Sequence, residues 1–123
     1  MVDPWAAALY DLLDATRAAN GLPALERQPA LEDVAEGWSA SMLASATLAH
    51  ATDLPAQLPA GWTSAAENVG VTLGGDAASL HDAWLASPGH RANLLDAGLD
   101  AVGIGVARGG DGRVWVTVDL TGS

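Results

Sequence analysis

The spacing of hydrophobic residues predicts two long helices in the first half of the chain. An apolar stripe at helical spacing runs through residues 4–20, where Asp3 can cap the first turn and Pro4 suits the first helical position. A second stripe predicts a helix over residues 29–48, with acidic side chains near its positive N-terminal end. Residues 51–66 lose the periodicity and contain two prolines, which predicts a loop.

The second half of the chain switches to short helices and strands. A helix is predicted over residues 76–86, and Ser87 is the expected N-cap of another that follows at once. The segments Leu99–Ala107 and Arg113–Leu120 are rich in β-formers and flank a glycine-rich turn, which predicts an antiparallel hairpin. Valine alternates with other side chains along the last segment, so both of its faces should be covered. Residues 67–72 are expected to form a third strand.

Four residues predict how these elements pack. Trp38 and Trp84 each lie centrally in an apolar stripe, so both are expected to be buried. Gly103 and Gly105 lie inside a strand pattern that no helix follows. A phosphate-binding loop is therefore a poor interpretation, and close packing of a helix against the sheet is the better one.

Composition narrows the class of protein further. With 123 residues, half of them hydrophobic, the chain is expected to form one domain over residues 1–123. Its net charge is -10, and all five basic residues are arginine, which excludes nucleic acid and anionic membranes as natural partners. The absence of cysteine excludes disulfides and thiol nucleophiles. No apolar run reaches the ~20 residues of a spanning helix, so no membrane insertion is expected.

Three histidines and one glutamate are the candidate chemical groups. His50, at the expected end of the second helix, is either a helix cap or a ligand. His90 lies in the first turn of a capped helix, which favours a neutral ring that is either a ligand, a base or an ordinary surface residue. His81 is expected to be structural. Glu67 begins an apolar strand, where it is either half-solvated or buried with a partner.

The familiar motifs of several enzyme classes are missing. The sequence has no nucleophile elbow, phosphate-binding loop, dinucleotide-binding fingerprint or paired-histidine zinc helix. Ser87 and His90 share one helical turn, but no acid is placed to orient the histidine, so a serine triad is not predicted.

Several runs of the chain form a recognisable pattern in combination. They are LLDATR at 12–17, GLPAL at 21–25, L-x-x-V-A-x-x-W-S-x-x-M at 31–42, LAH at 48–50, ENV at 67–69, WLASPGHRANLL at 84–95 and VGIGVA at 102–107. This pattern resembles the CAP superfamily, also called the SCP domain, which holds cysteine-rich secretory proteins, antigen 5 and pathogenesis-related proteins. The run around His90 is similar to the short, cysteine-free bacterial branch.

The resemblance implies a fold and a site. The fold is an α+β, three-layer α-β-α sandwich with a small antiparallel sheet. The family's central cleft is lined by two histidines and usually two glutamates, which places His50, Glu67 and His90 in the cleft here. The second glutamate would fall at position 87, where this chain has Ser87. The two histidines would be the metal ligands, with zinc or another divalent metal as the cofactor.

Three functions stay open on this basis. The first is a monomeric binding module that takes a small-molecule, lipid or peptide ligand. It is expected to be secreted or on the cell surface, although no signal peptide is expected in the chain shown. The second is a metal-dependent hydrolase in which Glu67 is the general base on a water held by His50 and His90. The third is a structural or protein-interaction domain with a metal-free polar cluster.

Overall fold

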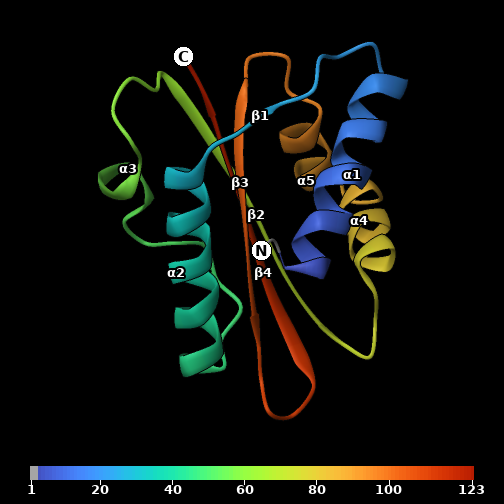
Figure 1. Ribbon diagram of the computed structural model, residues 1–123, viewed down its shortest axis with the longest axis vertical. Coiled ribbons are helices and arrows are strands. Elements are labelled where there is room, and N and C mark those ends of the chain that lie inside the picture. The colour runs from blue at the N-terminus through green and yellow to red at the C-terminus, as the bar shows by residue number, and fades with distance from the viewer. Residues whose placement is uncertain (1–2) are drawn as a thin grey trace.

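The computed structural model describes residues 3–123 as a sheet between two helical layers. Helices α2 and α3 cover one face of the sheet, and α1, α4 and α5 cover the other (Figure 1). The three-layer α-β-α sandwich is therefore confirmed. The elements in chain order are α1 Pro4–Ala19, β1 Glu26–Arg27, α2 Pro29–Ser45, α3 Leu54–Gln57, β2 Ser64–Leu73, α4 Ala77–Leu85, α5 Pro88–Leu94, β3 Ala101–Arg108 and β4 Arg113–Gly122.

The sheet is mixed, with the strand order β1-β3-β4-β2. Strands β3 and β4 form the predicted antiparallel hairpin, and β2 pairs antiparallel with the other side of β4. The short strand β1 runs parallel to the start of β3. Strand β2 is therefore an edge strand. Across residues 3–123, none of the helices combines the length and the apolarity that crossing a bilayer requires.

Both faces of strand β4 are buried, as its alternating pattern predicts. Val116 and Val118 belong to the main core under α1 and α4, and their exposed fractions are 0% and 1%. Trp115 points to the other side, where it packs with Met42 of α2. Because neighbouring side chains of a strand point to opposite faces, Thr117 lies on the α2 side with Trp115.

Arg17 fixes the C-terminal end of α1 against the segment that follows α5. Its side chain is fully buried and donates hydrogen bonds to the backbone oxygens of Pro23, Leu94 and Asp96 at 2.9, 3.0 and 3.1 Å. A guanidinium has five donors in a fixed plane, so one side chain can satisfy several otherwise unpaired carbonyl groups. This contact helps to position α5, which carries His90.

Glycine at two positions of β3 allows α2 to lie directly on the sheet. A Cβ atom added to Gly103 would lie 2.2 Å from the backbone carbon of Leu31, and one added to Gly105 would lie 2.1 Å from the backbone nitrogen of Glu36. The close packing predicted for these two glycines is confirmed. The helix backbone occupies the space that side chains would take on other strands.

The structure corrects the expected boundaries around α2. The helix was expected to reach residue 48 but ends at Ser45, because Ala46 adopts the left-handed conformation with φ of 51°. His50 therefore lies in the following loop and does not cap the helix. The segment expected to be a loop also contains α3 and the first residues of β2, and β1 was not predicted.

The two tryptophans expected in the core differ. Trp84 is 4% exposed and belongs to the main core, as predicted. Trp38 is only partly buried, so the expectation for this residue is wrong. Its ring packs against the cluster of Met42, Val69 and Trp115, and its Nε1 donates a hydrogen bond of 2.8 Å to the backbone oxygen of Ala49. Trp38 thus braces the loop that carries His50.

Candidate functional site

A buried carboxylate holds an exposed histidine at the edge strand. Oε1 of Glu67 lies 3.1 Å from Nδ1 of His50 and accepts a 2.9 Å hydrogen bond from the backbone nitrogen of Ala51. The Glu67 side chain is 4% exposed and that of His50 is 63% exposed. An ionised carboxylate only accepts hydrogen bonds, so this contact assigns the ring proton to Nδ1 and leaves Nε2 as an acceptor. Glu67 is therefore buried with a partner, not half-solvated.

The second histidine is held by the serine that precedes its helix. Nδ1 of His90 lies 2.9 Å from Oγ of Ser87. Ser87 occupies the predicted N-cap position of α5, but its side chain makes no capping hydrogen bond to the helix backbone. The serine hydroxyl instead orients the imidazole, and Nε2 of His90 again remains on the far side of the ring.

Two asparagines connect these two pairs through strand β2. Nδ2 of Asn68 donates to the backbone oxygen of His90 at 3.1 Å, and Nδ2 of Asn93 donates to Oδ1 of Asn68 at 3.0 Å and to the backbone oxygen of Glu67 at 3.3 Å. Glu67 and Asn68 are consecutive, so their side chains point to opposite faces of the sheet. His50 therefore approaches β2 from the α2 side and His90 from the α5 side.

The residues that would hold a metal here are the two imidazoles, because the carboxylate of Glu67 is already engaged. Within residues 3–123, no group of three or more histidine or acidic side chains has the arrangement of a metal site. Oε1 of Glu67 is already used by His50 and Ala51. An imidazole whose Nδ1 is held by an oxygen partner presents Nε2 for coordination, which is the usual arrangement around zinc. Glu67 would therefore act on a bound metal only through His50.

Asp119 is a buried acid that the sequence analysis did not select. It is the cross-strand partner of Glu67, and its exposed fraction is 0%. Within the described part of the chain, neither Asp119 oxygen nor Oε2 of Glu67 has a hydrogen-bond partner. Burial, followed by the neighbouring Glu67 carboxylate, raises the pKa of Asp119 to about 9. Asp119 is therefore protonated at neutral pH, and its proton is the donor that this pair can share.

Asp119 also changes the interpretation of the acid that is missing at position 87. The chain does place a second carboxyl group beside Glu67, but it comes from β4 and not from the helix before His90. The signal was present in the sequence: Trp115, Thr117 and Asp119 alternate along one strand, so Asp119 lies on the same buried face as Trp115.

The protonated Asp119 predicts a stability that falls as pH rises. Its folded pKa of about 9 exceeds its ordinary value of 3.8, so between these values the folded state binds a proton that the unfolded chain has lost. The free energy of unfolding should fall by up to about 1.4 kcal/mol per pH unit for one such proton. The total loss between about pH 7 and pH 9 is about 2 kcal/mol, because the slope decreases as the pH approaches the folded pKa. Urea unfolding at three pH values measures this slope.

Asp119→Asn is the matched variant, because an amide is neutral over the whole range. It should flatten the dependence between about pH 7 and pH 9. Other shifted groups contribute little there: burial lowers the pKa of His81 below 6.5, and burial raises that of Tyr10 to about 12. A wild-type stability that is constant over this interval, or a variant with the same slope, would show that Asp119 is ionised in the fold.

His81 has the structural role predicted for it. It is 3% exposed, and its Nε2 lies 2.8 Å from Oγ1 of Thr16 on α1. The contact joins α4 to α1 within the layer that covers the main core, so His81 is separate from the pair of histidines at β2.

Two hollows of the surface lie away from these histidines. One of about 240 Å³ is lined by residues that include Glu26, Asp100 and Thr121. The other, of about 520 Å³, is lined by residues of α1, α2 and β3. None of His50, Glu67, Ser87 and His90 lines either hollow. The two hollows are therefore distinct from the expected His/Glu site.

Comparisons with known proteins agree with this architecture. An outer surface protein from Borrelia burgdorferi superimposes with a TM-score of 0.85 at 20% identity, over 94% of this chain and 90% of that one. An extracellular protein containing an SCP domain from Bacillus anthracis gives 0.81 at 25% identity, over 95% of this chain and 40% of that one. Venom allergen-like protein 4 of Schistosoma mansoni gives 0.78 at 11% identity, over 98% and 90%. A search of curated proteins finds no match.

These likenesses and the three-layer sandwich define the class of protein as an SCP-type domain. The profile of the cysteine-rich secretory protein family, CAP, matches residues 10–120. The chain therefore belongs to the CAP family, as its sequence pattern indicates. It spans less than half the length of the Bacillus anthracis protein.

Proposed function

We propose that this chain is an extracellular binding module whose site is formed by His50 and His90 on either side of strand β2. The observation that carries the proposal is that each ring is held at Nδ1 by an oxygen partner, Glu67 for His50 and Ser87 for His90. This arrangement leaves Nε2 of both rings for a ligand, and a divalent metal such as zinc is the ligand that best suits a pair of imidazoles.

The extracellular location is supported by the relatives. The Borrelia burgdorferi protein is described as an outer surface protein and the Bacillus anthracis protein as extracellular. The family to which the chain belongs is named for secretory proteins. The acidic, cysteine-free composition is compatible with such a location, since a domain with an adequate core does not need disulfides.

The contacts of Glu67 favour a positioning role over general-base catalysis. A general base must come within hydrogen-bond reach of the water it activates. The Glu67 side chain is 4% exposed, and Oε1 already contacts His50 and the backbone of Ala51. The carboxylate therefore serves to fix the tautomer and orientation of His50. The hydrolase alternative has no observation in its favour.

Zinc calorimetry on chelator-treated protein tests the proposal. Wild type is expected to take up zinc with modest affinity, because two protein ligands leave the remaining positions to water. His50→Ala and His90→Ala should each abolish the heat of binding. Uptake should also weaken in acid, since an imidazole must be unprotonated to coordinate. His50→Ala should leave urea unfolding nearly unchanged, because the side chain is mostly exposed.

Glu67→Gln separates the positioning role from coordination. The amide oxygen can still accept from the backbone of Ala51, but the group is no longer an anion that orients His50. Loss of such a partner typically costs about 10–100-fold in metal affinity. Equal zinc uptake by all the variants, or none by wild type at millimolar metal, would contradict the metal site and leave a metal-free polar cluster.

A further inference from the structure

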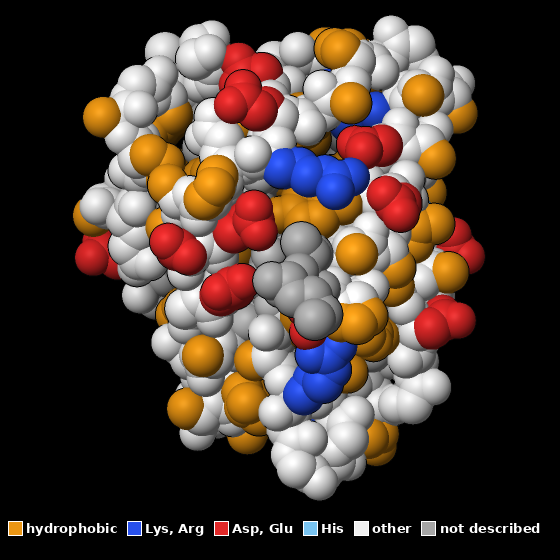
Figure 2. Space-filling model, in the orientation of Figure 1, with side chains coloured by type: hydrophobic (Ala, Val, Ile, Leu, Met, Phe, Trp, Pro, Cys, Tyr) orange, Lys and Arg blue, Asp and Glu red, His pale blue; other side chains and the backbone are white. Residues whose placement is uncertain are grey.

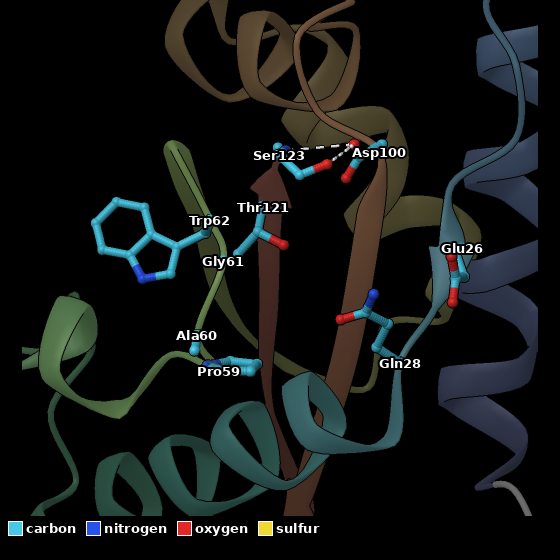
Figure 3. Close-up of a pocket in the computed structure, with 10 residues that line it drawn as sticks. Glu26, Gln28, Pro59, Ala60, Gly61, Trp62, Asp100, Thr121 and Ser123 are labelled. Atoms are coloured by element: carbon cyan, nitrogen blue, oxygen red, sulfur yellow. Dashed lines mark hydrogen bonds between the residues drawn. The ribbon is translucent and has the colours of Figure 1, made fainter.

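The hollow of about 240 Å³ lies at one end of the sheet, on the α2 side. Strand β1 with Gln28, the start of β3, the end of β4 and the loop after α3 form its walls (Figure 3). It is separate from His50 and His90, so an inference about it does not rest on the proposed function.

The walls of this hollow are held by backbone hydrogen bonds. Four of them join the segments on its different sides, and their lengths lie between 2.7 and 3.0 Å. The hollow is therefore formed before any ligand arrives, as is usual for sites that bind small molecules. Written from donor to acceptor, the four hydrogen bonds are Thr63 N to Gly122 O, Glu26 N to Asp100 O, Asp100 N to Thr121 O, and Gln28 N to Val102 O.

Acceptor groups dominate the lining. Glu26 and Asp100 contribute carboxylates and Gln28 contributes an amide, while none of the lining residues is an arginine. Oδ2 of Asp100 accepts from the backbone nitrogen and the hydroxyl of Ser123 at 3.3 and 2.8 Å, which orients the carboxylate and leaves Oδ1 for another donor. Acidic side chains also outnumber basic ones on the face in Figure 2 and in the whole chain, whose net charge is -10.

A buried hydroxyl is the second, independent observation. Thr121 is 7% exposed and lines the hollow, and its oxygen points toward the side of Gln28 in Figure 3. No hydrogen bond within residues 3–123 involves this hydroxyl. Thr117, four residues earlier on the same face of β4, is paired with Oγ of Ser39 at 2.8 Å. A hydroxyl that lines a hollow on a mostly buried side chain and has no protein partner calls for a ligand or solvent partner.

We infer that this hollow binds a small organic cation, an alkylammonium or guanidinium group, through Glu26, Asp100, Gln28 and Thr121. Such a group carries a positive charge and several N–H donors, which match two carboxylates, an amide oxygen and a hydroxyl. A divalent metal fits less well, because only two carboxylates line the space. The cation comes either from a free amine or from a basic side chain of a peptide.

Nuclear magnetic resonance on uniformly ¹⁵N-labelled protein tests this site. The probes are methylguanidinium, its neutral counterpart methylurea, a capped tripeptide with a central arginine, and the same peptide with citrulline. Both cationic probes should shift the amide signals of Gln28, Gly61 and Ser123 at millimolar concentration, and the neutral probes should not. Shifts with the peptide alone would identify the source as a basic peptide side chain, and shifts with both would identify a site open to free cations.

Matched variants separate a built site from general attraction to an acidic protein. Glu26→Gln and Asp100→Asn should each weaken binding about tenfold, because each removes a charged acceptor. Thr121→Val should weaken it as well, although it changes no charge and preserves the shape of the side chain. Asp82→Asn, on α4 in the other helical layer, removes the same charge and should have no effect.

Three results would overturn the inference. They are the absence of shifts with either cationic probe, equal shifts with the neutral probes, and affinities that change equally in Asp82→Asn and Asp100→Asn. In addition, if the single variants Thr121→Val and Glu26→Gln both bind as tightly as wild type, the cation lies elsewhere on the surface. Zinc uptake at His50 and His90 is measured separately, so either proposal can fail while the other stands.

Discussion

Trp84→Ala is expected to lower the free energy of unfolding by about 3–5 kcal/mol, since removing a buried aromatic ring leaves a cavity that the surrounding core fills only partly. The ring is 4% exposed and belongs to the core shared by α1, α4 and the sheet. Its Nε1 also donates a 3.2 Å hydrogen bond to the backbone oxygen of Val69. Urea unfolding monitored by circular dichroism measures the loss.

Trp38→Ala is the comparison that makes this result specific. Trp38 already contacts water, so its removal should cost less, about 2 kcal/mol or below. Its larger effect should be on the loop that carries His50, because the bond to Ala49 is lost. Zinc uptake should therefore weaken in Trp38→Ala by more than the loss of stability alone would cause. Equal losses of stability in the two variants would contradict the difference in burial.

Gly105→Ala should cost about 3 kcal/mol, even though it adds a single methyl group. The new Cβ would lie 2.1 Å from the backbone nitrogen of Glu36 and 2.2 Å from the backbone carbon of Ala35. These atoms belong to a helix backbone and cannot rotate away like a side chain, so α2 must move off the sheet. Overpacking of this kind typically costs about 1–3 kcal/mol, and more where backbone must shift.

Gly37→Ala supplies the control on the same helix. A Cβ at position 37 meets no atom within 4 Å, and the residue lies inside α2. Because alanine favours a helix over glycine, this variant should gain about 0.5–1 kcal/mol. If the packing is as described, thermal unfolding will show a higher melting temperature than wild type for Gly37→Ala and a lower one for Gly105→Ala. A stabilised Gly105→Ala would show that α2 does not rest on β3 at this point.

Long amphipathic elements were predictable from the sequence, and short or special ones were not. The stripes of α1 and α4 and the alternation of β4 each extend over several repeats, so the helices and the hairpin followed from pattern alone. The order of the layers followed from the family resemblance. Strand β1 has two exposed residues and α3 has four residues, so neither leaves a periodic signal. The early end of α2 depends on a left-handed alanine, a conformation that usually marks glycine.

The candidate site also has features that the sequence predicts and features that it does not. The motif pointed to His50, Glu67, Ser87 and His90, and the direct contacts within each pair follow from the fold. That the consecutive residues Glu67 and Asn68 contact the two histidines from opposite faces of β2 could not be read from the sequence, because it depends on which face each residue of an edge strand takes. Asp119 lies inside a strand and not at the end of an element, and its place beside Glu67 comes from the pairing of β4 with β2, which the sequence does not show.

The position of β4 within the sheet has a consequence for biosynthesis. This strand occupies residues 113–122, the last of the strands to be synthesised, yet it lies between β3 and β2 and joins them. Before β4 emerges from the ribosome, β3 can pair only with the two residues of β1 and β2 has no partner strand, so the sheet cannot assemble cotranslationally in stages. A nascent chain arrested before residue 113 should remain sensitive to protease, whereas release of the segment up to residue 122 should confer resistance in one step.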